Sequence, residues 1–139
     1  MRMFFYGTLT DPDVLELVIG HALPAEAVEP AVAPGFRRVF IAGRDYPMLL
    51  RHPPGRVAGI LVAGLDTVAI HRLLVFEGGE YALQPIQVLT GSGHAVTAHV
   101  FFCAPGVQPD RRPWRLEDWQ RRHKRAFLRR TRSRLARMP

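Results

Sequence analysis

The segment Tyr6-Gly7-Thr8-Leu9, near the start of the chain, is a candidate anion-binding turn. An aromatic run predicted to be a buried strand ends at Gly7, and a helix is predicted to follow. A turn of this kind leaves main-chain N–H groups unpaired and convergent, which suits carboxylate or phosphate oxygens. Gly7 can also adopt a positive φ, which some turns of this kind require. The alternative is an ordinary turn before a capped helix.

Glu77, between Phe76 and Gly78, is the candidate general acid/base. It is predicted to lie just past the end of a helix, where the negative end of the helix dipole raises the pKa of a carboxyl group. The aromatic neighbour acts in the same direction. A raised pKa suits proton transfer near neutral pH. The alternative is a surface glutamate in a loop.

Other reaction types lack their characteristic residues. Ser92 and Ser133 stand outside any Gly-x-Ser-x-Gly elbow, and Cys103 lies in an apolar predicted strand. The six histidines show no ligand spacing on one helix face, and no Cys-x-x-Cys pair occurs. No phosphate-binding glycine motif is present either. We therefore expect no metal site and no cofactor.

The elements that must position these residues are mixed in order. Apolar patterns and turn residues predict strands over residues 2–6, 36–42, 46–50, 56–65, 81–89 and 95–103, the last two as a hairpin. Helices are predicted over residues 12–19 and 67–74, and one long helix from about residue 113. Residues 24–34, rich in proline, are predicted to be an extended connection. This mixed order favours an α+β fold.

At 139 residues the chain is expected to form one domain over residues 1–139. It contains no run of about 18 apolar residues and no basic segment leading into an apolar one. With its single cysteine, these features favour a cytoplasmic protein without membrane association. The oligomeric state stays open.

The formal charge of +7 is concentrated at the C-terminus. Residues 110–139 hold 12 of the 19 Lys and Arg residues and 3 of the 12 Asp and Glu residues, so the rest of the chain is weakly acidic. The basic C-terminal helix is interpreted as a solvated face. Binding of nucleic acid or another polyanion is the alternative; it would use the following residues: Arg121, Arg122, Lys124, Arg125, Arg129, Arg130, Arg132, Arg134 and Arg137.

The order of three motifs resembles the gamma-glutamyl cyclotransferase-like superfamily. These motifs are Phe4-Phe5-Tyr6-Gly7-Thr8-Leu9, Tyr46-Pro47-Met48-Leu49, and Phe76-Glu77-Gly78 followed by Tyr81. The resemblance covers residues 2 to about 103 and is nearest to a short bacterial branch, similar to gamma-glutamylamine cyclotransferases. It implies a small mixed β-barrel with flanking helices.

The resemblance also implies roles for individual residues. Tyr6, Gly7, Thr8 and Leu9 are expected to bind the glutamyl part of a substrate, Tyr81 to line the pocket, and Glu77 to act as catalytic acid/base. The implied reaction is an acyl transfer that cyclises a gamma-glutamyl amine or peptide to 5-oxoproline, with no cofactor.

The chain departs from the family pattern at two positions. Members often have Asp before the Phe-Glu pair and Arg two residues after the tyrosine, where this chain has Leu74 and Leu83. These differences support a second hypothesis, a catalytically silent module that binds a small metabolite in the same fold.

Overall fold

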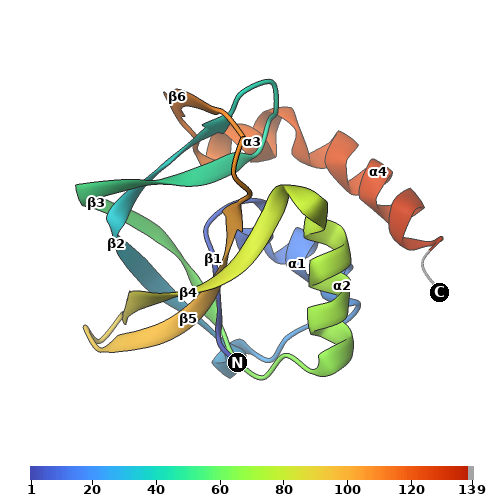
Figure 1. Cartoon of the computed structure of the whole chain (residues 1–139). Coiled ribbons are helices and arrows are strands. Elements are labelled where there is room, and N and C mark those ends of the chain that lie inside the picture. The colour runs from blue at the N-terminus through green and yellow to red at the C-terminus, as the bar shows by residue number, and fades with distance from the viewer. Residues whose placement is uncertain (138–139) are drawn as a thin grey trace.

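The computed structural model describes residues 1–137, with residue 80 described by its main chain only, and its strands close into a barrel (Figure 1). The strands pair in the order β3-β1-β5-β4-β2, and a β2–β3 pairing closes the ring. Only β1 and β5 pair in parallel. The six strands are β1 Met3–Phe5, β2 Val28–Ile41, β3 Pro47–Val62, β4 Tyr81–Thr90, β5 Ala95–Cys103 and β6 Pro109–Pro113. The predicted α+β fold, a small mixed β-barrel with flanking helices, is confirmed.

Within residues 1–137, four α-helices and three short 3₁₀ segments accompany these strands, and α3 and α4 follow the last strand. The α-helices are α1 Pro12–Ile19, α2 Thr67–Glu77, α3 Leu116–Arg122 and α4 Lys124–Leu135; the 3₁₀ segments are η1 Thr8–Thr10, η2 Ala25–Ala27 and η3 Gly78–Glu80. In Figure 1, α2 and α4 lie on the same side of the barrel. None of the helices within residues 1–137 is long and apolar enough to cross a membrane.

The local signals predicted several elements closely. Asp11 caps α1 by accepting hydrogen bonds from the amides of Asp13 and Val14, and Gly20 ends the helix with a φ of 93°. The predicted hairpin is present as β4 and β5, with Tyr81 opposite Cys103. These elements have their stop and start signals within a few residues of their ends.

The proline-rich segment and the strands predicted over residues 36–42, 46–50 and 56–65 largely belong to two long strands, β2 and β3. β2 begins at Val28, and β3 runs without interruption from Pro47 to Val62, so residues 28–34 are strand. Pro30 and Pro34 are exposed and pair with β3 on one side. β4 pairs only with Ala31 and Val32 on the other side, so an N–H is not needed at either proline.

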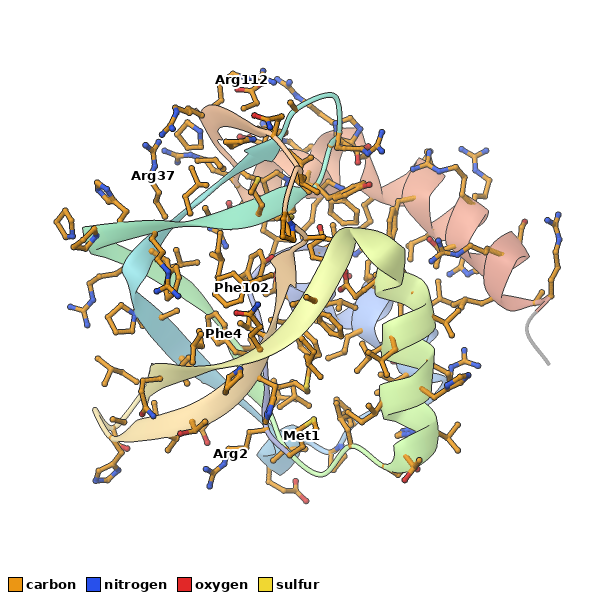
Figure 2. The ribbon with its side chains drawn as sticks, in the orientation of Figure 1. Met1, Arg2, Phe4, Arg37, Phe102 and Arg112 are labelled. Carbon is orange, nitrogen blue, oxygen red and sulfur yellow. The ribbon has the colours of Figure 1, made fainter. Side chains whose placement is uncertain are left out.

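β1 divides its side chains between two cores. Phe4 packs inside the barrel with residues such as Val88 and Val100, whereas Met3 and Phe5 face the helices. This alternation follows from the period of two in a strand. Figure 2 shows the barrel interior near Phe4 and Phe102, with Arg37 and Arg112 at the outer edge. β1 thus joins the barrel to its helical cover.

The single helix predicted from about residue 113 is wrong in its start and its continuity. Pro113, the last residue of β6, pairs with Val39 of β2, and the amide of Trp114 donates to the carbonyl of Arg38 at 3.3 Å. These contacts keep the segment extended. The helical segment begins at Leu116 and is interrupted at His123, whose φ is −125°. The apolar spacing between Trp119 and Phe127 continues across the break, which is why the sequence pattern did not reveal it.

Candidate functional site

A cavity of about 530 Å³ lies where the loop after β1 meets the end of α2. Its wall includes all six residues predicted for the site: Tyr6, Gly7, Thr8, Leu9, Glu77 and Tyr81. Apolar side chains from β1, β5 and α4 also line it, among them Phe4, Phe101 and Phe127. A concave cavity of this size, lined by both apolar and polar groups, is suited to a small molecule.

Glu77 is the last residue of α2, although it was predicted just past the helix end. Gly78 ends the helix with a φ of 69°, a conformation that favours glycine, and its amide donates to the carbonyl of Leu74. The Glu77 side chain is half-buried, and it lines the cavity. Burial raises its pKa to about 8, against an opposing effect of Arg134. The predicted direction is confirmed, with burial as the main cause.

The four residues of the loop from Tyr6 to Leu9 line the cavity. The carbonyl of Gly7 accepts from the amide of Thr10 at 3.0 Å and from its hydroxyl at 2.5 Å. The carbonyl of Thr8 accepts from the amide of Asp11. Within residues 1–137 no hydrogen bond is found for the amides of Gly7, Thr8 and Leu9. These three amides remain available as donors.

Gly7 is needed for a reason other than the positive φ expected from the sequence. Its φ is −118°, so this turn does not use the positive φ that glycine can adopt. A Cβ atom on Gly7 would lie 2.9 Å from Cγ and 3.2 Å from Cδ of Pro47, at the start of β3. The close approach of the Pro47 ring therefore excludes a larger side chain. The sequence contains no local signal of this contact, because the two residues are forty positions apart.

Two tyrosines of the wall are held by hydrogen bonds to main-chain carbonyls. The Tyr6 hydroxyl donates to the carbonyl of Phe101 at 2.8 Å, and the Tyr81 hydroxyl donates to the carbonyl of Pro47 at 3.2 Å. Burial, followed by the neighbouring acidic groups, raises the pKa of both phenols far above neutrality. Both tyrosines are therefore neutral hydrogen-bond donors that hold the wall in place.

The sequence did not indicate that α4 belongs to the cavity. Arg130, Thr131 and Arg134 line it, although the basic helix was interpreted as a solvated face. The ring of Phe127 meets the ring of Phe76 edge-on, at 6.0 Å between centroids, and this contact joins α4 to the end of α2. The spacing of Arg130 and Arg134, four residues apart on one helix face, was the available signal.

The site can transfer protons and bind an anion with its own residues. Among the described residues, no group of three or more His, Cys, Asp or Glu side chains could hold a metal ion. Glu77 supplies a carboxyl group whose raised pKa suits both accepting and donating a proton. The amides of Gly7 to Leu9 supply neutral donors for an oxyanion or a carboxylate.

Comparison with known proteins identifies one family across most of the chain. The family model described as "Gamma-glutamyl cyclotransferase, AIG2-like" matches residues 3–121. AIG2-like protein D of Arabidopsis thaliana is 30% identical over 132 residues, covering 93% of this chain and 85% of the relative. AIG2-like protein A of the same plant is 27% identical over 129 residues, covering 91% and 76%.

Solved structures agree with this result. The solution structure of an Arabidopsis thaliana protein is similar with a TM-score of 0.70 and 25% identity, covering 99% of this chain and 93% of that one. A gamma-glutamyl cyclotransferase gives a TM-score of 0.58 at 13% identity, covering 79% and 68%, which is a likeness of fold alone. The predicted place in a short bacterial branch stays a prediction.

Proposed function

The chain belongs to the gamma-glutamyl cyclotransferase, AIG2-like, family, and we propose that it cyclises a gamma-glutamyl amine or peptide to 5-oxoproline. One observation carries this proposal: Glu77 and the unpaired amides of Gly7 to Leu9 line the same cavity. The first group can move protons, and the second can bind a carboxylate. A volume of about 530 Å³ is large enough for a glutamyl group with part of its leaving amine.

In the proposed complex, the amides of Gly7 to Leu9 hold the α-carboxylate of the glutamyl group. The apolar wall around Phe101 and Tyr81 excludes water and holds the substrate chain folded. Folding brings the α-amine against its own γ-carbonyl carbon. Such intramolecular reactions reach effective molarities of about 10⁵ to 10⁸ M, so positioning provides much of the rate enhancement.

Glu77 manages the protons of the reaction. Its carboxylate removes one proton from the α-ammonium, and the resulting amine attacks the γ-carbonyl carbon to close a five-membered ring. The ring nitrogen loses a second proton to solvent as the new C–N bond forms. Protonated Glu77 then donates to the nitrogen of the leaving amine while the old C–N bond breaks. The released amine takes up a proton from water, so the proton balance closes.

The two departures from the family pattern lie outside the described wall of the cavity. The side chain of Leu74 is exposed on α2, and Leu83 is half-buried in β4 with the helical core around it. Neither leucine is among the described residues that line the cavity. This arrangement supports turnover over the silent binding module, because the proposed acid/base and the amide donors are still present.

Mass spectrometry of 5-oxoproline tests the proposal. The protein is incubated with a panel of gamma-glutamyl amines, amino acids and peptides, and we expect 5-oxoproline from at least one of them. Glu77→Gln should lower kcat by about 10²- to 10⁴-fold, the usual contribution of a general acid/base. Binding of panel members without turnover would favour the silent module. Turnover unchanged in Glu77→Gln would refute the proposed role of Glu77.

A further inference from the structure

Helix α4 brings two positive charges to the mouth of the cavity. Arg130 and Arg134 line the cavity and are exposed, whereas Thr131 between them is buried. The Arg134 guanidinium lies over the ring of Phe76, 5.2 Å from the ring centroid. Phe76 directly precedes Glu77 in the sequence. Both arginines therefore stand where the cavity opens to solvent, and both are able to contact a ligand that extends outward.

Contacts at its N-terminal end fix α4 in this position. Lys124 pairs with Asp11 at 2.9 Å and with Asp13 at 2.8 Å, which ties the first turn of α4 to α1. Phe127, one turn further on, packs edge-on against Trp119 at 5.2 Å and against Phe76 at 6.0 Å. The arginines are therefore presented by a helix that is held on two sides, and the orientation of that helix is defined.

Among the described residues of the cavity wall, positive charges outnumber negative charges. Glu77 is the one carboxylate among the lining residues whose side chains are described, and with a pKa of about 8 it is largely neutral at pH 7. The two guanidinium groups stay charged. A gamma-glutamyl group has no net charge, since its ammonium balances its α-carboxylate, which the amides of Gly7 to Leu9 already accommodate. A ligand that matches the site carries a further negative charge near its outer end.

We propose that Arg130 and Arg134 form a second carboxylate subsite that binds the leaving part of the substrate. The substrate is then a gamma-glutamyl amino acid or peptide, and an uncharged or cationic leaving amine is disfavoured. Arginines four residues apart on one helix face can approach the same carboxylate, and guanidinium groups match carboxylate geometry with paired hydrogen bonds. This inference rests on the proposed cyclotransferase function, and it assigns α4 the selection of the leaving amine.

Two substrates that differ in one group test the subsite. Gamma-glutamylalanine and gamma-glutamylethylamide share the reacting atoms, and the second lacks only the alanine carboxylate. We expect the wild-type protein to prefer gamma-glutamylalanine in kcat/KM. The double change Arg130→Gln and Arg134→Gln should lower that preference by about tenfold, a value limited by solvent screening at exposed arginines. Any effect of Arg134 on Glu77 is common to both substrates, so it cancels in the ratio.

Arg132→Gln is the matched control, since Arg132 is exposed on the same helix and does not line the described cavity. It removes one positive charge, as each change of the double variant does, and the substrate preference should stay at the wild-type value. An equal fall in the preference for Arg132→Gln would indicate a general charge effect and overturn the subsite. A double variant that keeps the wild-type preference would also overturn it.

Calorimetry with Glu77→Gln separates the subsite from the proposed reaction. This variant can bind the two compounds without turning them over, so affinities replace rates. We expect gamma-glutamylalanine to bind about tenfold more tightly than gamma-glutamylethylamide, and this difference to disappear when Arg130 and Arg134 are also replaced by Gln. If no compound is turned over but this difference is observed, the proposed function fails and the subsite stands. Equal affinities for both compounds refute the subsite whether or not turnover occurs.

Discussion

At the scale of single residues, the position of Glu77 determines its chemistry. The side chain lies at the end of α2 against the cavity, where burial disfavours the charged form. The charged group of the described wall that acts on it is Arg134 of α4, while Tyr6 and Tyr81 stay neutral because their pKa values are raised. A carboxyl group with a pKa of about 8 is close to the α-ammonium in proton affinity.

The pH dependence of turnover should follow this pKa. The base is active when ionised and takes its proton from the α-ammonium, so kcat/KM should rise about tenfold per pH unit up to about pH 8 and fall again above the pKa of the ammonium. Initial rates of 5-oxoproline formation between pH 5.5 and 9.5 measure the profile. A profile already level at pH 6 would mean that the ionised carboxylate is not disfavoured in the free protein.

Glu77 also links stability to pH, independently of turnover. Its pKa is raised from 4.5 to about 8 on folding, so the folded protein keeps a proton that the unfolded chain has released. Stability therefore falls as pH rises from about 4.5 to about 8. Glu77→Gln cannot ionise and avoids this loss, so relative to wild type it should gain about 2 to 4 kcal/mol over that range.

Urea denaturation at pH 5 and at pH 8.5 measures the unfolding free energy of Glu77→Gln relative to wild type. Glu16→Gln, an exposed change on α1, serves as the control and should show the same difference from wild type at both pH values. If the difference in unfolding free energy between Glu77→Gln and wild type did not depend on pH, the carboxyl group would ionise as easily in the folded protein as in the unfolded chain.

Gly7 is the position at which the loop is least tolerant of change. The Cβ of Gly7→Ala would meet the Pro47 ring at 2.9 Å, and because this ring is rigid, the loop or β3 must shift. We expect a loss of about 1 to 3 kcal/mol in unfolding free energy together with reduced kcat/KM. Gly91→Ala is the control, since the nearest atom to its Cβ is 4.0 Å away. Equal stabilities of the two variants would contradict the contact with Pro47.

At the scale of elements, α1 and α4 are joined by a buried carboxylate. Asp11 is fully buried, caps α1, and accepts from the side-chain amide of Gln120 at 2.8 Å and from Lys124. Burial alone would raise the pKa of Asp11, but the hydrogen bonds from Lys124, Gln120 and Val14 together hold it below its ordinary value. One carboxylate thus holds the loop that follows β1 and the helix that carries the arginines.

Lys124→Met should separate these elements. The change leaves Asp11 buried without its cation, at a cost of about 2 to 4 kcal/mol in unfolding free energy. Because the pKa of paired Asp11 is lowered on folding, its contribution is present above its unfolded value near 3.8 and is lost as pH falls below it. The difference between wild type and Lys124→Met should accordingly shrink in acid.

Thermal and urea denaturation at pH 7 and pH 3 measure this effect. Arg125→Met replaces the exposed neighbour of Lys124 and should change stability by less than about 0.5 kcal/mol. A Lys124→Met protein as stable as Arg125→Met at pH 7 would mean that the pair does not hold α4. Polyanion binding by the exposed side of this helix stays the open alternative to a solvated face.

At the scale of the whole molecule, the sequence was informative where signals are local. The cap at Asp11, the stop at Gly78 and the hairpin from Tyr81 each depend on a few adjacent residues, and these elements appear close to where they were predicted. The proline-rich segment was less clear: Pro30 and Pro34 fit into β2 only because the barrel leaves their side partly unpaired. Closure of the barrel through β2 and β3 is not visible in any window of sequence.

The candidate site also shows this difference between local sequence signals and contacts that depend on the closed fold. Motif order brought Glu77 and the Tyr6–Leu9 segment into one hypothesis, and the fold places both at one cavity. The contribution of α4 was missed because Arg134 meets Phe76 across 58 positions of chain. The requirement for Gly7 was assigned to φ because its neighbour Pro47 comes from another strand. Contacts that depend on the closed fold have no local sequence pattern.

The most direct test of the central claim is an NMR titration of ¹⁵N-labelled Glu77→Gln with a gamma-glutamyl compound that it binds. If the ligand occupies the shared cavity, the amide signals of Gly7, Thr8 and Leu9 should shift together with those of Gly78 and Gly79, since all five residues line it. Saturation at one common ligand concentration is expected. Binding that leaves the Gly7 to Leu9 amides unmoved, with shifts confined to other surfaces, would contradict the account.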